Sequence, residues 1–172
     1  MKVKVEVVDS NPNWINEFNT EKICLYELLG NLVQDIHHIG STSIPGLAAK
    51  PIIDIILEVS NLDGLDKLSS KMNLLGYEAK GEFGIVGRRY FVKGSFDRSH
   101  QIHAFQVGDE NIKRHIAFRD YIKSHPDVKR EYAVLKKKLA IECNNNIDQY
   151  CDGKDKFVKF YELKALEWLT NT

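Results

Sequence analysis

The feature that most constrains the fold of this chain is the stretch from residue 38 to residue 55, HIGSTSIPGLAAKPIIDI. Its first half is small, polar and rich in glycine, and its second half is apolar except for one acid, Asp54. Glycine lets a backbone approach an anion closely, and neighbouring hydroxyl groups add hydrogen-bond donors. The stretch therefore predicts a phosphate-binding turn that faces a metal-binding carboxylate.

The candidate phosphate-binding residues at this turn are Gly40, Ser41, Thr42 and Ser43. We expect a short helix over residues 42–49, whose first backbone amides would hold a phosphate with the help of the helix dipole. The alternative is an ordinary Gly-Ser turn that caps a helix, which is the commonest use of these residues.

Asp54 lies inside the apolar run IIDIIL at positions 52–57. A buried carboxylate without a partner costs several kcal/mol, so a metal ion, an arginine or backbone amides must compensate it. One interpretation pairs Asp54 with Arg88, Arg89 or His38. The other makes Asp54 a ligand of Mg²⁺ or Mn²⁺, because such hard cations often take one or two carboxylates plus substrate phosphates.

The charge balance and the cysteines limit the class of protein. Lys+Arg and Asp+Glu both number 24, which argues against a dedicated nucleic-acid or membrane-surface protein but leaves room for a local anion site. The three cysteines form no Cys-x-x-Cys pair, which argues against a disulfide framework or a thiolate zinc site. No stretch approaches the roughly 20 apolar residues of a membrane span, and we expect a cytoplasmic protein.

The hydrophobic periodicity predicts one domain over residues 1–172, with a sheet core over about 1–108 and a helical portion over about 109–172. Strands are expected at 3–8, 32–39, 51–59, 77–80, 88–92 and 99–107. Helices are expected at 14–29, capped by Asn13, and at 42–49, 61–75, 111–124, 127–143 and 154–169. Asn144-Asn145-Asn146 and Asp152-Gly153 predict a loop region before the last helix. The predicted fold class is α/β (α+β), a mixed sheet flanked by helices.

The order of the expected elements resembles the DNA polymerase β-type nucleotidyltransferase superfamily: a strand, a Gly-Ser turn, a short helix and a strand that bears an acid. The longer string at 38–55 resembles the GrpB family within it. The same family pattern continues at RRYF (88–91), RSHQIH (98–103), FRDY (118–121) and EY with LK (131–136), so it covers nearly the whole chain. The resemblance implies a cytoplasmic nucleotidyltransferase-fold protein. In some bacteria a GrpB-like domain is fused to dephospho-CoA kinase, which implies a CoA-pathway enzyme as a partner by analogy.

The superfamily places two metal-binding acids on one strand, as Asp-x-Asp or Asp-x-Glu, and usually a third on a later strand. Position 56, which shares a face with Asp54, is Ile56. Glu58 follows on that face, but at about 3.3 Å per residue it lies roughly 13 Å from Asp54, too far to share one ion. The expected metal site is therefore incomplete.

His100 and His103 lie where the third acid would be expected. Residues three apart on an ideal strand point to opposite faces, so we expect one of them, His103, to face Asp54. Imidazole suits Mn²⁺, Zn²⁺ or Fe²⁺ better than Mg²⁺, and a pKa near neutrality also suits a general acid or base. The alternative is a partly buried, hydrogen-bonded histidine.

Several other residues complete the predicted pocket. His38 shares a strand face with Gly40 and is expected to line it, with His100 as a further pocket residue. Lys50, Arg88 and Arg89 are candidates for neutralising phosphate, and Arg119 and Lys136 for closing over a nucleotide. Ordinary surface charge is the alternative for these cations.

Three hypotheses remain open from the sequence. In the first, a metal-assisted enzyme transfers a nucleotidyl group to an unknown acceptor, using Asp54 and His103. In the second, the same pocket binds a nucleotide or CoA-related metabolite without catalysis, because Ile56 replaces the second acid. In the third, the scaffold supports metal-assisted hydrolysis with His103.

Overall fold

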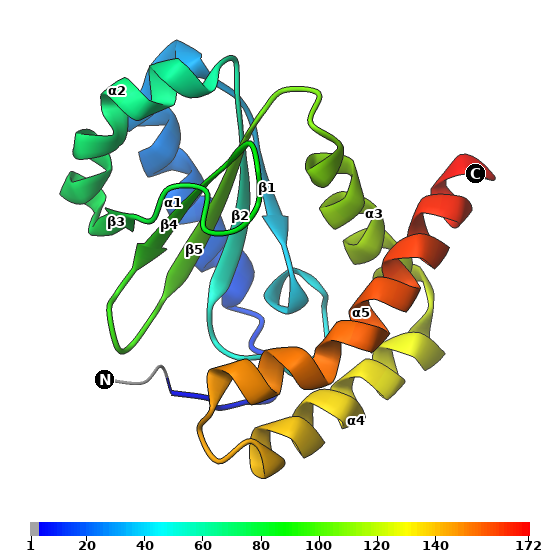
Figure 1. Ribbon diagram of the computed structural model, residues 1–172. Coiled ribbons are helices and arrows are strands. Elements are labelled where there is room, and N and C mark those ends of the chain that lie inside the picture. The colour runs from blue at the N-terminus through cyan, green and yellow to red at the C-terminus, as the bar shows by residue number, and fades with distance from the viewer. Residues whose placement is uncertain (1–3) are drawn as a thin grey trace.

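The computed structural model describes residues 4–172 as a five-stranded mixed sheet flanked by helices, with a helical C-terminal portion (Figure 1). The helices are α1 (Trp14–Leu29), α2 (Leu62–Met72), α3 (Glu110–Ser124), α4 (Pro126–Glu142) and α5 (Ile147–Thr170). The strands are β1 (Val33–Ile39), β2 (Ile53–Val59), β3 (Tyr77–Ala79), β4 (Arg88–Lys93) and β5 (His100–Gln106). The fold class predicted from the sequence is confirmed.

The strand order in the sheet is β1-β2-β5-β4-β3. The central pair, β2 and β5, is parallel, and the β1–β2, β4–β5 and β3–β4 pairs are antiparallel. Ile39 of β1 pairs with Asp54 of β2, and Asp54 pairs with Gln101 of β5. Asp54 thus lies at the start of a central strand, with the Gly40 turn on one side and β5 on the other.

The two faces of the sheet carry different helices. α1 and α2 pack on one face, where Ile53, Ile55 and Leu57 join the main hydrophobic core (Figure 1). The other face carries α3, whose Ile112 packs in a cluster with Ile56. Because strand side chains alternate between faces, the odd-numbered positions of β2 fill the first core, and Asp54, Ile56 and Glu58 belong to the second face.

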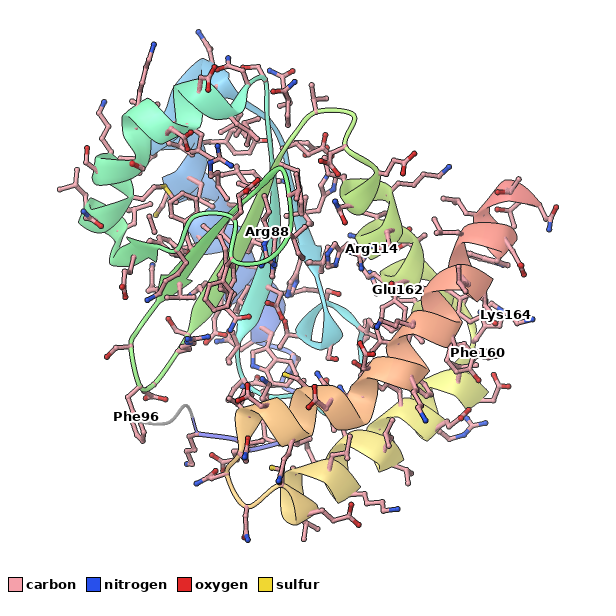
Figure 2. The ribbon with its side chains drawn as sticks, viewed as in Figure 1. Arg88, Phe96, Arg114, Phe160, Glu162 and Lys164 are labelled. Carbon is pink, nitrogen blue, oxygen red and sulfur yellow. The ribbon has the colours of Figure 1, made fainter. Side chains whose placement is uncertain are left out.

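The C-terminal helices join this second face. In Figure 2, Arg114 of α3 and Glu162 of α5 point toward each other, and Arg114 Nη1 donates a 2.9 Å hydrogen bond to Glu162 Oε1. α5 begins at Ile147 rather than at the predicted Lys154, so the loop predicted at Asp152-Gly153 is wrong. A Cβ at Gly153 would lie 2.4 Å from Leu139 Cδ2 of α4, so this glycine serves close helix packing and ends no helix.

The strand predicted over residues 3–8 is also wrong for the residues that the structure describes; Val3 lies outside them. Only Val8 makes a β-bridge, to Ala49. The amide of Val5 instead donates to Asn145 Oδ1 at 3.0 Å, and the Val5 side chain packs with Cys143 of the helical portion. An alternating pattern fits this extended segment without a neighbouring strand to pair with it.

The short helix predicted over residues 42–49 is a single 3₁₀ turn, η2 (Ser41–Ser43). Pro45 disfavours a helical conformation at the residue before it, and Gly46 has a φ of +79°, which stops a right-handed helix. Asn13 occupies the predicted N-cap position of α1, but its Oδ1 accepts from Asn16 Nδ2 and caps no helix amide. Within residues 4–172, no helix combines the length and the apolar character needed to cross a bilayer.

Candidate functional site

A cavity of about 190 Å³ opens where the start of β2 meets α4 and α5. The Gly-Ser turn and the segment before β2 form one wall, β5 contributes Gln101, and the C-terminal helices form the opposite wall. The polar and charged side chains that line it are those of Ser41, Thr42, Lys50, Asp54, Gln101, Lys136, Tyr150, Cys151 and Lys154. The sequence therefore located one wall of the site, and the fold supplies the other.

Gly40 packs closely against Asp54, which lines this cavity. A Cβ on Gly40 would lie 2.9 Å from Asp54 Oδ2, and the glycine has a φ of +70°, a conformation that side-chain-bearing residues rarely adopt. The Asp54 side chain is 29% exposed, so this acid, expected to be buried, is reached by solvent. The turn and the carboxylate face each other as predicted.

Asp54 also faces His103, as the alternation of β5 predicts. His103 Nε2 lies 3.4 Å from Asp54 Oδ1, and His103 Nδ1 lies 3.3 Å from Arg88 Nη1. A guanidinium can only donate, so Nδ1 accepts and Nε2 carries the ring proton toward Asp54. In this tautomer Nε2 has no lone pair for a metal, and His103 acts as a hydrogen-bond donor that orients the carboxylate.

His103 stacks against two other rings. Its ring centroid lies 5.3 Å from that of Tyr90 and 5.7 Å from that of His115. Burial lowers the pKa of His115 to about 3, and the neighbouring His103 acts in the same direction. His115 therefore stays neutral at physiological pH and adds no charge beside the Asp54–His103 pair.

Three lysines from different parts of the chain line the cavity: Lys50 before β2, Lys136 of α4 and Lys154 of α5. Lys136 is 1% exposed, and its Nζ has no hydrogen-bond partner among the described residues. Burial, followed by the charges of Lys154 and Lys50, lowers the pKa of Lys136 to about 6. An amine this deeply buried and unsatisfied is costly, and an anion in the cavity would compensate it.

The amines of these lysines lie over the rings of two tyrosines, Tyr150 and Tyr132. The Nζ atoms of Lys50 and Lys154 lie 5.1 Å and 4.6 Å from the centre of the Tyr150 ring, and Lys136 Nζ lies 4.5 Å from that of Tyr132. Cation–π contacts of this kind favour the charged forms. Burial raises the pKa of Tyr132 to about 12, so the ring remains neutral beside the cavity.

The structure places His38 on the face opposite to Asp54, contrary to the expectation that it shares the pocket. Its ring stacks on Phe18 of α1 at 4.7 Å, and its Nε2 bonds Thr42 Oγ1 at 2.9 Å. Burial lowers the pKa of His38 to about 4, so it is neutral. His38 acts on the site indirectly, by fixing Thr42, which lines the cavity from the turn.

The two arginines of β4 lie on opposite faces, and neither lines the cavity. Arg89 forms a paired ion contact with Asp66 of α2, at 2.7 Å and 3.0 Å, on the face away from Asp54. Arg88, labelled in Figure 2, lies on the Asp54 face, but it is 7% exposed and donates to the carbonyls of Glu82 and Phe83 as well as to His103. Its contacts position His103 and the preceding loop.

His100 and Arg119 also lie outside the cavity. His100 faces α1, with its Nε2 3.9 Å from Glu21 Oε2, and burial lowers its pKa. Arg119 Nη1 donates to the His38 carbonyl at 3.0 Å, and its Nε donates to Asp120 at 2.8 Å, at the edge of β1. The fold thus moves these two predicted pocket residues away from Asp54.

Ile56 occupies the position of the second acid and is fully buried. Within residues 4–172, the one cluster of at least three potential metal ligands is formed by Asp35, His37 and Glu58, whose ligand atoms lie within 4.8 Å of one another. Glu58 Oε1 lies 2.6 Å from His37 Nε2, which is an ordinary ion-pair distance. Asp54 is not part of this cluster. This agrees with the expectation from the sequence that Glu58 lies too far from Asp54 to share an ion with it.

Lys154, Gln101 and Cys151 are cavity residues that the sequence did not reveal. Gln101 could have been found, because it shares the strand face of His103. Lys154 and Cys151 could not, because the Asp152-Gly153 pair between them predicted a loop in place of one continuous helix. Lys136 was expected to close over a ligand, and it lines the cavity.

Comparison with known proteins gives this arrangement a context. A family model described as GrpB protein matches residues 4–164. YqkA of Bacillus subtilis is 46% identical over 167 residues, which cover 97% of this chain and 49% of YqkA. The chain thus spans about half the length of that relative. The glutamate-rich protein GrpB of Alkalihalophilus pseudofirmus is 35% identical, with 91% of this chain and 93% of that protein covered.

Solved structures with a similar fold include a member of the same family and more distant proteins. GrpB from Enterococcus faecalis superposes with a TM-score of 0.92 at 40% identity, covering 95% of this chain and 99% of that one. More distant structures share the fold alone: the GLD-2/RNP-8 complex at TM-score 0.58 and 12% identity, and Cid1 with its short product ApU at 0.52 and 14%. A dephospho-CoA kinase of Mycobacterium leprae is 23% identical over 96% of this chain and 47% of that enzyme.

Proposed function

Because the chain belongs to the GrpB family and has a nucleotidyltransferase-like fold, we propose that it binds a nucleoside triphosphate in the Asp54 cavity and transfers the nucleotidyl group to an acceptor with the help of a divalent cation. The observation that carries the proposal is the meeting of one carboxylate with three lysines in one cavity. Lysines attract the phosphates, and the carboxylate suits a cation that accompanies them.

The phosphates would lie between the Gly-Ser turn and the C-terminal helices. Gly40 allows a close backbone approach, and Ser41 lines the cavity on the wall opposite Lys136 and Lys154. The unpartnered Nζ of Lys136 would gain both a hydrogen-bond acceptor and a counter-charge from a bound phosphate. Arg89, expected to supply positive charge, is replaced in this role by Lys136 and Lys154.

Asp54 is the residue that would hold the cation. Its carboxylate is partly exposed in the cavity, and His103 donates to its Oδ1 from one side, which leaves Oδ2 as the better ligand atom. One carboxylate fits a Mg²⁺ or Mn²⁺ ion that takes most of its other ligands from water and substrate phosphates. Such an ion, when bound, neutralises phosphate charge and polarises the phosphoryl oxygens.

A second candidate function is a non-catalytic module that binds a nucleotide or a CoA-related metabolite. The observation in its favour is Ile56, which fills the place of the second acid and packs against α3. The likeness to a dephospho-CoA kinase supports an enzyme of CoA metabolism as the partner of such a module. Both functions use the same cavity, but only the first one predicts that a bound nucleotide is turned over.

An assay with labelled ATP, CTP, GTP and UTP, in Mg²⁺ or Mn²⁺, tests transfer, and calorimetry with the same nucleotides and CoA species tests binding. We expect Asp54→Asn to abolish turnover. Asp66→Asn, a matched change on the opposite face, is expected to retain it. Tight binding without turnover in the wild type would favour the module, and equal turnover in wild type and Asp54→Asn would reject Asp54 catalysis.

A further inference from the structure

Cys151 is placed differently from the other two cysteines. Cys24 is half-buried and Cys143 is buried, whereas Cys151 is exposed. Cys151 lies in the second turn of α5 and lines the cavity together with Lys50, Lys136 and Lys154. A reagent that enters the cavity from solvent therefore meets a thiol among amines.

The charges around Cys151 favour anionic reagents. Burial lowers the pKa of Lys154, and the neighbouring Cys151 and Asp54 act in the opposite direction. Burial and then Lys154 lower the pKa of Lys50, and Cys151 again acts in the opposite direction. Both amines line the cavity together with Cys151, and they would attract a negative group to the same place.

Lys136 gives independent support for an anion in this cavity. Its side chain is almost fully buried, and its Nζ lacks a partner among the described residues. A negatively charged ligand tethered to Cys151 would supply that partner. This observation separates Cys151 from a surface cysteine that happens to have a basic neighbour.

We propose that Cys151 is a modification site for disulfides that carry negative charge, with oxidised glutathione as the model compound. The Cys151 thiol loses its proton to solvent, and the thiolate attacks one sulfur of the reagent. The disulfide bond of the reagent breaks, a bond forms between Cys151 Sγ and the attacked sulfur, and the other half leaves as a thiolate. The disulfide is the oxidant, so electrons balance without a further reactant.

The mixed disulfide occupies the cavity and excludes other anions from it. This exclusion rests on the proposed function, because it makes modification and nucleotide binding mutually exclusive. The modification itself depends on the thiol and the lysines alone.

The test reacts the reduced protein with oxidised glutathione or with cystamine, a cationic disulfide, and follows modification by intact mass. The rate with each reagent is divided by its rate with a peptide that contains a single cysteine. We expect the anionic reagent to be favoured at Cys151 by about tenfold or more at low salt. The double change Lys50→Gln/Lys154→Gln should remove the preference, and Lys138→Gln, on the exposed surface of α4, should keep it. In 1 M salt, where the Debye length is about 3 Å, the wild-type preference should collapse, a readout that needs no variant.

Equal normalised rates for the two reagents, or reaction at Cys24 before Cys151, would overturn the proposal. Nucleotide binding is then compared before and after glutathione modification, with Cys151→Ser as the unreactive control. Binding that disappears on modification and returns with dithiothreitol supports the exclusion. If the reduced wild type binds no nucleotide while Cys151 still prefers the anionic reagent, the proposed function fails and the modification site stands.

Discussion

At the residue scale, the site depends on a contact that a single methyl group would destroy. Gly40 leaves just enough room for the Asp54 carboxylate, and its φ of +70° is also one that alanine adopts at a cost. Two separate penalties therefore fall on any side chain at this position. Gly81, with a φ of +63° and nothing within 4 Å of a built Cβ, would suffer only the backbone penalty.

We predict that Gly40→Ala destabilises the protein more than Gly81→Ala does. Both variants pay about 1 to 3 kcal/mol for the left-handed backbone, and Gly40→Ala also displaces Asp54. Urea unfolding measures the difference, and calorimetry with nucleotide and Mn²⁺ should show weakened binding for Gly40→Ala alone. Equal losses of stability and binding in the two variants would contradict the contact.

The buried amine of Lys136 predicts a pH-dependent stability. Its pKa falls from 10.5 to about 6 on folding, because of burial and then the charges of Lys154 and Lys50. Between these pH values the unfolded chain binds a proton that the folded chain does not. The free energy of unfolding that is lost through Lys136 therefore becomes smaller as the pH rises. Below about pH 6 both states are protonated and the full cost remains.

Lys136→Met should therefore be more stable than the wild type by about 1 to 4 kcal/mol at pH 6, because a buried apolar side chain replaces an unpaired amine. The advantage should shrink by pH 9. Urea unfolding at both pH values measures it, with the exposed Lys138→Met as the control for a general charge effect. An advantage that is the same at both pH values would show that Lys136 does not titrate between them.

At the element scale, the strands of the sheet were easier to predict than the start of α5. The strands of the sheet follow from alternation and apolar runs, and β2 and β5 appear within two residues of their predicted bounds. The start of α5 could not be predicted from local pattern, because a glycine such as Gly153 usually indicates a turn. Its role depends on Leu139, which lies in another helix and cannot be inferred from neighbours in the sequence.

We predict that the effect of Gly153→Ala changes sign with the residue at position 139. In the wild-type background the new methyl group overlaps Leu139 Cδ2 and should destabilise the α4–α5 contact by about 1 kcal/mol or more. With Leu139→Ala the overlap disappears, and alanine should stabilise α5 by up to about 1 kcal/mol over glycine. A double-mutant cycle in urea measures the coupling, and additive effects would contradict close packing here.

At the scale of the whole molecule, the site lies between two parts of the chain. The Gly-Ser turn and Asp54 belong to the sheet, and Lys136 and Lys154 belong to the C-terminal helices. The sequence predicted the sheet half from local pattern. It could not predict how α4 and α5 dock against that half, or which arginine of the adjacent pair faces Asp54, because both depend on contacts between residues far apart in the chain.

A ligand that bridges the two parts should stabilise both. At 100 times its Kd, nucleotide with Mn²⁺ contributes about 2.7 kcal/mol, which raises the Tm by about 5 to 10 °C for a chain of this size. Hydrogen exchange should slow most in the first turns of α5 and least in α2, on the opposite face. A Tm rise without slower exchange in α5 would place the ligand elsewhere.

During synthesis, β2 leaves the ribosome with only one of its two strand partners. β1 is already available to pair, but the parallel partner β5 ends at Gln106, and β2 ends at Val59. At about 5 to 20 residues per second, the intervening segment takes roughly 2 to 10 seconds to emerge. For that time the most apolar strand of the protein exposes an unpaired edge, which is a template for aggregation. We therefore expect the parallel pair at the centre of the sheet to make the nascent chain prone to aggregation, so that overexpression without added chaperones favours inclusion bodies.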